Sequence, residues 1–144
     1  MLQLFHQVLT DTEVITYIID FLVRKQGLSL TETADVIAAP FWSDIEAMEP
    51  EERERMTYHR NMFSSLLITG PFSILLGCTG GMMALNDRLK LRSMVVAEKE
   101  DRFFIASEES AIRIIQPELD RIWAPRGGEP VIVQLEQGQG GEQA

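Results

Sequence analysis

Cysteine is nearly absent from this sequence of 144 residues, in which Cys78 is the single example. One cysteine cannot form a disulfide within the chain, and such sparse use is typical of proteins in a reducing compartment. We therefore expect a cytoplasmic protein. Histidine is also scarce. His6 and His59 are the two present, and neither has a second ligand at the spacing of a metal site, so we expect no bound metal.

Long apolar runs and an excess of basic charge are missing as well. The longest apolar region, residues 66–78, is interrupted by Thr69-Gly70-Pro71, whereas a membrane-spanning helix needs about 20 apolar residues. Residues 1–8 lack the basic start and the cleavage site of a secretory signal. The 13 Lys and Arg against 22 Asp and Glu give a net charge of -9, which argues against nonspecific binding to nucleic acid or anionic membranes.

The sequence does contain clear helix starts. Thr10 and Glu13 fit a capping box, in which each side chain accepts a hydrogen bond from the other residue's backbone amide. Asp11 then lies in the first turn, where the helix dipole favours a carboxylate. Apolar residues recur at helical spacing until Gly27. This helix is so apolar that we expect it to be covered on both sides.

Further helices are predicted through the middle of the chain. Ser29 and Glu32 form a second capping box, and Pro40 ends the helix that they open. Pro50 fits the first position of a later helix. His59 lies on the apolar stripe of that helix, where a packed residue is more common than a catalytic base.

The second half of the chain has the pattern of short strands. Residues 72–76 form a continuous apolar run, which is typical of a strand buried on both faces. Ser107 is expected to cap a short helix. The predicted strands are 1–9, 72–76, 82–85, 94–97, 103–106 and 131–135, with a further extended piece within 112–122.

Helices followed by strands predict an α+β domain, in which the helices cover one face of a mainly antiparallel sheet. The apolar runs indicate that the other face is covered too. The chain offers too few further elements to cover it. We therefore expect a part of the fold to be missing or supplied by a partner.

Five short segments between residues 10 and 135 carry a resemblance to a known family. They are Thr10-Asp11-Thr12-Glu13-Val14, Gly70-Pro71-Phe72-Ser73, Asp87-Arg88-Leu89-Lys90-Leu91-Arg92-Ser93-Met94, Ala106-Ser107-Glu108-Glu109-Ser110-Ala111-Ile112 and Gly128-Glu129-Pro130-Val131. Together and in this order they resemble the C-terminal half of a class II glutamine amidotransferase domain. The third segment departs from the family pattern, because Lys90 replaces a Gly and Ser93 replaces a Pro.

This family of N-terminal-nucleophile hydrolases includes glutamate synthase, amidophosphoribosyltransferase, glucosamine-6-phosphate synthase and glutamine-dependent asparagine synthetase. The helical insert at 41–67 makes the chain most similar to glutamate-synthase-type amidotransferase subunits. The resemblance implies an incomplete αββα sandwich over residues 1–136, and we expect the Gly- and Gln-rich tail at 137–144 to be disordered. It also implies hydrolysis of the glutamine amide, with ammonia passed to a synthase.

The resemblance assigns Asp11 as the carboxylate that holds the α-amino group of glutamine, but it assigns no catalytic residue. The family nucleophile is an N-terminal cysteine, its oxyanion hole is an Asn-Gly pair, and an upstream Arg holds the substrate carboxylate. Residue 1 is Met, residue 2 is Leu, and no Asn-Gly pair occurs. Cys78 lies where the family keeps no nucleophile. The chain is therefore not expected to be a competent enzyme alone.

Three hypotheses are open at this point. The chain is part of a glutamine amidotransferase, completed by the N-terminal half of that domain or by a synthase subunit. Alternatively, it is a non-catalytic scaffold or regulatory remnant that acts through partner binding. The third is an unrelated α+β enzyme that uses Asp11, Glu13 or His59 as acid or base. The chain has no cofactor signal, and FMN and an iron-sulfur cluster are implied by analogy for a partner synthase.

An incomplete sandwich has a measurable consequence. We expect the isolated chain to self-associate, because an uncovered apolar sheet edge pairs readily with another chain. Light scattering across a concentration series measures the average mass. A mass that stays at the monomer value throughout the series would count against a half-domain.

Overall fold

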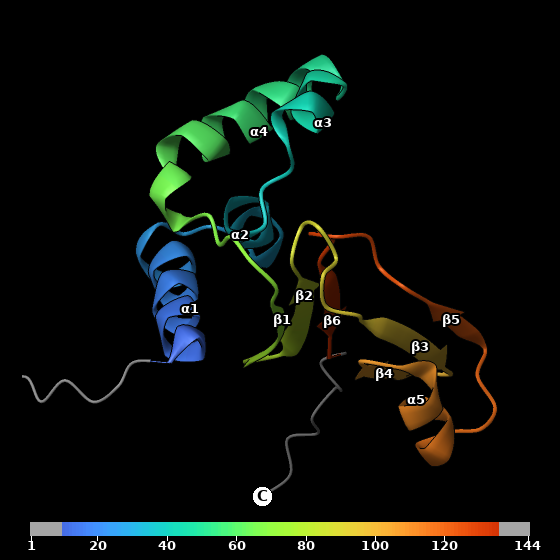
Figure 1. Ribbon diagram of the computed structural model, residues 1–144. Helices are drawn as coiled ribbons and strands as arrows, with labels where there is room; N and C mark the ends of the chain where they lie inside the picture. The colour runs from blue at the N-terminus through green and yellow to red at the C-terminus, as the bar shows by residue number, and fades with distance from the viewer. Residues whose placement is uncertain (1–9, 136–144) are drawn as a thin grey trace, which may run out of the picture.

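A computed structural model describes residues 10–135 (Figure 1), so the strand predicted at 1–9 and the tail at 137–144 lie outside the described residues. The helical elements are α1 (Asp11–Asp20), a π-helical turn (Phe21–Lys25), α2 (Leu30–Ile37), α3 (Trp42–Glu46), α4 (Pro50–Met62), a 3-10 turn (Ser64–Leu66) and α5 (Glu109–Ile115). The strands are β1 (Ser73–Cys78), β2 (Gly81–Asn86), β3 (Val95–Lys99), β4 (Arg102–Ala106), β5 (Arg121–Trp123) and β6 (Val131–Gln134). The α+β class is confirmed.

The local signals in the sequence explain where most helices begin. The capping box of Ser29 and Glu32 is complete, with the Ser29 amide 2.8 Å from a Glu32 carboxylate oxygen and the Glu32 amide 3.2 Å from the Ser29 hydroxyl. The Ser29 hydroxyl, which donates to the Glu32 carboxylate at 2.7 Å, and the Ser29 amide together hold the pKa of Glu32 below its ordinary value. Pro50 is the first residue of α4, as predicted. The end of the first helical region at Gly27 is also confirmed, since Gly27 has a φ of 73°.

One predicted cap is half right and another is wrong. The Thr10 hydroxyl accepts the Glu13 amide at 3.3 Å, but no return bond forms, because the Glu13 carboxylate accepts the Tyr17 hydroxyl at 3.1 Å one turn further along. Ser107 does not cap α5. That helix begins after Glu108, because β4 continues through Ala106 and the chain needs a turn before the helix.

The strands form two antiparallel sheets of three strands each, where the strand pattern predicted one. Sheet A has the order β1-β2-β6, and sheet B has the order β4-β3-β5. The register pairs Leu75 with Ala84 in sheet A and Val96 with Ile105 in sheet B. Because side chains alternate along a strand, each sheet has one face toward the helices and one face toward the other sheet.

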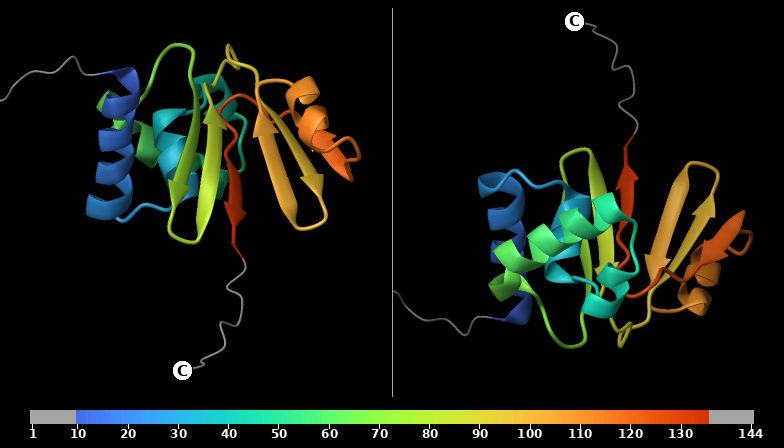
Figure 2. Two further views of the ribbon diagram at one scale, coloured as in Figure 1. Left: turned by 90° about the horizontal axis from the view of Figure 1, so that it is seen from below. Right: turned by 90° about the horizontal axis from the view of Figure 1, so that it is seen from above.

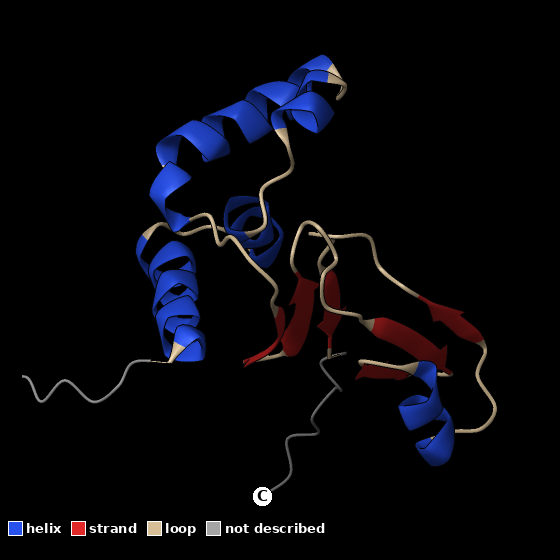
Figure 3. Cartoon of the chain, viewed as in Figure 1, coloured by secondary structure: helices blue, strands red, loops and turns tan. Residues whose placement is uncertain are grey.

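The elements are layered as helices, sheet A, sheet B and α5 (Figure 3). The outer core joins α1 and α2 to sheet A and includes the buried residues Leu22, Ile37 and Leu85. A smaller inner core joins the two sheets, through the buried Ala84 of β2 and Val96 of β3. Helix α5 packs against β4 on the far side of sheet B.

Two expectations about burial are wrong for the described chain. Residues of β1 alternate between half-buried and exposed instead of being buried on both faces, and Leu75 is 60% exposed. Helix α1 and the π-helical turn that follows it are not covered on both sides, since Val14, Tyr17 and Phe21 are exposed. In both cases no described element covers the second apolar side. Within residues 10–135, no helix combines the length and apolar character needed to cross a membrane.

A glycine turn before β6 touches the loop that leads from sheet A to sheet B. A Cβ atom on Gly127 would overlap the carbonyl oxygen of Arg88, and one on Gly128 would lie 2.9 Å from the carbonyl oxygen of Ala38. These contacts bring the 125–130 turn against the 87–92 loop and the end of α2. Gly127 is therefore needed for this close approach of two backbones.

We expect Gly127→Ala to lower the free energy of unfolding by about 1–3 kcal/mol, because the backbone of Arg88 must move to admit the methyl group. Gly77→Ala is the matched control, since a Cβ there meets no atom within 4 Å. Urea denaturation of both variants measures the difference. Equal stabilities for the two variants would contradict the close packing at Gly127.

Candidate functional site

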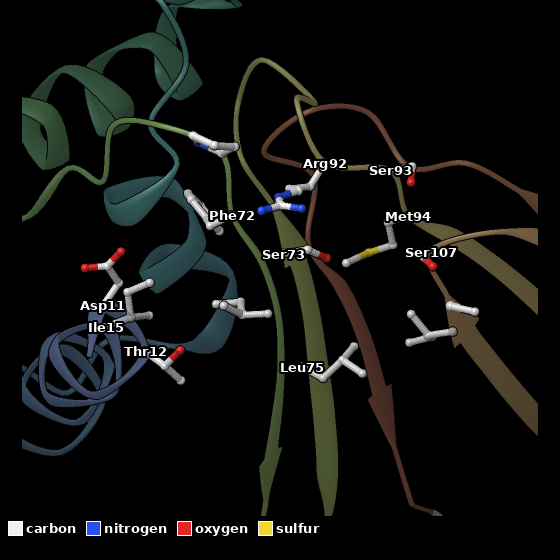
Figure 4. Close-up of a pocket in the computed structure, with 14 residues that line it drawn as sticks. Asp11, Thr12, Ile15, Phe72, Ser73, Leu75, Arg92, Ser93, Met94 and Ser107 are labelled. Carbon is white, nitrogen blue, oxygen red and sulfur yellow. The ribbon is translucent and has the colours of Figure 1, made fainter. Parts of the chain in front are cut away.

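Asp11 lies at the rim of a cavity of about 510 Å³ (Figure 4). The extended backbone of Thr10 leads into α1 and places Asp11 in its first turn. Thr12 and Ile15 follow Asp11 along the cavity wall. The cavity therefore opens beside the N-terminus of α1, where backbone amides and the helix dipole favour bound negative charge.

Four separate stretches of the chain line this cavity. They come from the start of α1, the start of β1, the loop before β3, and the end of β4, and comprise Asp11, Thr12, Ile15, residues 71–75, residues 92–94 and residues 105–107. Sheet A contributes one wall and sheet B another. The cavity thus lies where the two sheets separate, at the free edges of β1 and β4.

The loop before β3 is organised by one buried carboxylate. Asp87 is 2% exposed, and its oxygens accept the backbone amides of Leu89 at 3.1 Å, Leu91 at 3.0 Å and Arg92 at 3.1 Å. Burial alone would raise the pKa of Asp87, but these hydrogen bonds outweigh it and hold the pKa below its ordinary value. Asp87 is therefore a charged group whose hydrogen-bonding needs are met by the loop itself.

Lys90 occupies the sharpest point of this loop. Its φ is 54°, in the left-handed region that glycine adopts most easily. The backbone amide of Lys90 donates to the carbonyl of Asp87 at 2.9 Å, which closes a turn. The lysine therefore takes the conformation that a glycine would allow, although it differs from the family pattern at this position.

Arg88 connects the 87–92 loop to the helical insert. Its guanidinium donates to the carbonyl of Ala39 at 3.4 Å and lies 4.5 Å from the ring centroid of Phe41. Arg60 also donates to the Ala39 carbonyl. Burial and the nearby charge of Arg88 lower the pKa of Arg60. The same loop thus contacts the insert at Arg88 and the cavity at Arg92.

Arg92 and Asp11 give the cavity opposite charges on opposite walls (Figure 4). None of the four ion pairs found among residues 10–135 involves either side chain. Ser73 and Ser107 add hydroxyl groups to the lining. A cavity with a carboxylate, a guanidinium and neutral hydroxyls suits a small ligand that carries both an ammonium group and an anionic group.

The other residues singled out from the sequence do not join this site. The Glu13 carboxylate accepts a hydrogen bond from the Tyr17 hydroxyl, and Glu13 does not line the cavity. His59 is 4% exposed within α4, so the expectation of a packed residue is confirmed. Cys78 is at the far end of β1 and its thiol lies 3.4 Å from the carbonyl of Gly81. Among the described residues, no group of three or more metal-binding side chains comes together.

Asp11 is the one cavity residue that the sequence assigned to a site, and three further polar residues of the lining were not assigned. Ser73, Arg92 and Ser107 each belong to one of the segments singled out in the sequence, but no local signal shows where their side chains point. Their positions depend on how β1, the 87–92 loop and β4 meet in space. The one sequence signal that could have placed these three residues together is the order of the five family-like segments.

Comparison with known proteins gives one informative match. No protein-family model matches the sequence. A curated protein of Archaeoglobus fulgidus, described as uncharacterized, is 44% identical over 127 residues, which cover 88% of this chain and 34% of that protein. The chain therefore spans about a third of the length of this relative. No solved structure matches.

Asp87 provides a pH-dependent test of the loop. We expect Asp87→Asn to lower the free energy of unfolding at pH 7 by about 1.5–3 kcal/mol, because an amide cannot accept the same set of amide donors. The pKa of Asp87 is depressed in the folded chain, so its stabilisation is present above about pH 4 and is lost as pH falls below that value.

The stability difference between wild type and Asp87→Asn should therefore shrink between pH 5 and pH 2 in urea denaturation. Asp101→Asn, at an exposed turn residue between β3 and β4, serves as the control and should show a small difference at every pH. A difference for Asp87→Asn that stays constant across this range would contradict the role of its carboxylate.

Proposed function

We propose that this chain forms the C-terminal part of a class II glutamine amidotransferase domain, in which Asp11 binds the α-amino group of glutamine. The completed domain hydrolyses the glutamine side-chain amide and delivers ammonia to a glutamate-synthase-like synthase. The chain supplies substrate contacts and half of the sandwich. Another polypeptide region supplies the nucleophile.

The observation that carries this proposal is the convergence of the family-like segments. Four of the five segments contribute residues to one cavity, although they are spread over residues 10–112. The fifth does not line the cavity, but its Gly128 packs against Ala38 and the backbone of Arg88 in the third segment. Unrelated segments of similar sequence would not be expected to meet at one cavity.

The layering also supports the proposal. Helices, sheet A, sheet B and α5 follow one another in the order of an αββα sandwich, with both sheets antiparallel. The two sheets contact each other through a small inner core and separate toward β1 and β4. An N-terminal-nucleophile hydrolase fold with part of its strands removed has this open form.

The chemistry of the cavity fits an amino acid. A carboxylate such as Asp11 binds an ammonium group with two or three charge-assisted hydrogen bonds, which select against substrates that lack the amine. Arg92 lies across the cavity and adds positive charge on the opposite wall. The cavity volume of about 510 Å³ exceeds what one amino acid needs, which leaves room for the residues that complete the site.

The missing catalytic groups must come from outside this chain. The sequence has no cysteine near Asp11 and no Asn-Gly pair, so neither the nucleophile nor the oxyanion hole of the family is present. The Archaeoglobus fulgidus relative is about three times as long as the region it shares with this chain, which agrees with a unit that works as part of a larger protein. The ammonia-accepting partner would carry any FMN or iron-sulfur cluster.

The missing nucleophile also favours a second candidate function. A non-catalytic scaffold that keeps the fold and binds a partner would need neither a cysteine nor an Asn-Gly pair. Such a scaffold would gain nothing from a carboxylate at the cavity rim that has no ion-pair partner among residues 10–135, as is the case for Asp11. The two functions therefore differ in what Asp11→Asn does.

Reconstitution tests the proposed function. The chain is mixed with a polypeptide from a neighbouring gene that begins Cys-Gly-Ile and contains Asn-Gly, and release of glutamate from L-glutamine is measured. We expect hydrolysis only in the mixture. Asp11→Asn should lower kcat/KM by about 10–100-fold, chiefly through KM, because a hydrogen bond to a charged group is lost.

The matched control is Asp20→Asn, which removes a carboxylate from the other end of the same helix, where it pairs with Arg24 at 2.9 Å. Its kcat/KM should stay within about twofold of wild type, since an exposed ion pair contributes little to stability. Equal losses for the two variants, or no hydrolysis with any neighbouring gene product, would refute the proposal.

A further inference from the structure

Among residues 10–135, the outer edge of β1 pairs with no other strand, and this free edge lacks the features that protect edge strands. Strand β1 has the sequence Ser-Ile-Leu-Leu-Gly-Cys, with no charge and no proline over six residues. Natural sheets protect such edges with charged residues, prolines or bulges, because unpaired amides and carbonyls pair readily with another strand. In contrast, β4 and β5 each begin with an arginine, and β6 has only four residues.

The side chains of β1 that face sheet B are left uncovered. Leu75 is 60% exposed, although Ala84, its partner on β2, is fully buried in the inner core. On the opposite face, Ile74 and Leu76 are half-buried against the helices. The inner core thus reaches β2 and stops one strand short of the edge, so the apolar surface at β1 has no cover among residues 10–135.

Helix α1 extends past this edge. In both views of Figure 2, α1 lies on the side of β1 that faces away from β2. Its half-buried Ile15 and Ile18 pack at the margin of the outer core, and Ile15 also lines the cavity. A helix of this layer normally packs on the face of a sheet, and here no strand among residues 10–135 lies beyond β1 to form that face.

We propose that a strand from the polypeptide that completes this domain pairs with the free edge of β1, extends sheet A beneath α1 and borders the cavity beside Asp11. The inference rests on the proposed function, since it states where the completing region binds. The strand is uncharged on the face toward sheet B, where an apolar side chain covers Leu75. Pairing of this kind supplies main-chain hydrogen bonds for affinity and side-chain contacts for specificity.

The cavity gives this strand a functional position. Ser73 and Leu75 of β1 line the cavity together with Asp11 of α1. A strand paired along Ser73–Cys78 therefore passes directly beside these residues, and its residues become part of the cavity wall. The completing region would thus close the site at the point where this chain leaves it open.

Hydrogen exchange of two proteins tests the pairing. The first is this chain at low micromolar concentration, and the second is the long Archaeoglobus fulgidus relative. An alignment of 127 of the 144 residues must include the six residues of β1. In this chain, the amides of β1 directed at β2 should be protected and the others should exchange freely.

In the long relative, we expect about twice as many protected amides in the aligned strand, with exchange at the additional positions slowed by about 100-fold or more. Strand β2 has neighbours on both sides in this chain and serves as the internal control. An equal number of protected amides in both proteins would overturn the proposal. Extra protection in this chain that rises with its concentration is the self-association expected of an uncovered edge, so the comparison uses a concentration at which light scattering gives the monomer mass. Extra protection that persists at that concentration would overturn the proposal.

A pair of substitutions provides an independent readout. Leu75→Lys in this chain should leave Tm within a few degrees of wild type, because the side chain is already exposed. Lysine at the aligned position of the long relative should lower Tm by about 5 °C or more, since the site is covered there. Ile114→Lys on α5, at a residue 84% exposed, is the control in both proteins.

A small effect of the lysine in both proteins would show that the edge stays open and would overturn the proposal. These readouts do not depend on catalysis. A paired edge without glutamine hydrolysis would therefore overturn the proposed function alone, and hydrolysis with an unpaired edge would overturn this inference alone.

Discussion

The buried carboxylate of Asp87 organises the loop that connects the two sheets. The chain passes from sheet A to sheet B directly after β2, and the backbone amides of this crossing turn inward onto Asp87. The resulting loop fixes where β3 begins and directs Arg92 to the cavity. It also meets the glycine turn before β6 and, through Arg88, the helical insert. A single charge thus sets the relation between the two sheets.

Much of the local structure could be predicted from the sequence, because local signals decide it. The capping box at Ser29, Pro50 at the start of α4 and the strand pattern after Pro71 all depend on residues a few positions apart. The cap at Thr10 was only half right. The Glu13 carboxylate accepts a hydrogen bond from Tyr17, one helical turn further along, instead of the Thr10 amide. The capping-box pattern considers only Thr10 and Glu13, so it does not include this competing donor.

The two failed predictions about burial share a physical cause. Pattern rules predicted that α1 and β1 would be covered on both sides, and both have one uncovered apolar side in the described chain. Those patterns describe the environment that the side chains are suited to, which residues 10–135 do not provide. Arg92 was missed for a related reason, since its place in the cavity depends on long-range packing. The disagreement between pattern and burial is itself the strongest indication that other residues complete the fold.

We propose that Asp11 recognises the ammonium group of glutamine in a cavity that another polypeptide completes. The most direct measurement compares L-glutamine with 4-carbamoylbutanoate, the same amide without its α-amino group, as substrates of the reconstituted protein. Wild type should prefer glutamine strongly, and Asp11→Asn should reduce that preference by about 10-fold or more, because the two changes remove the same interaction. A preference that is unchanged in Asp11→Asn would contradict the account.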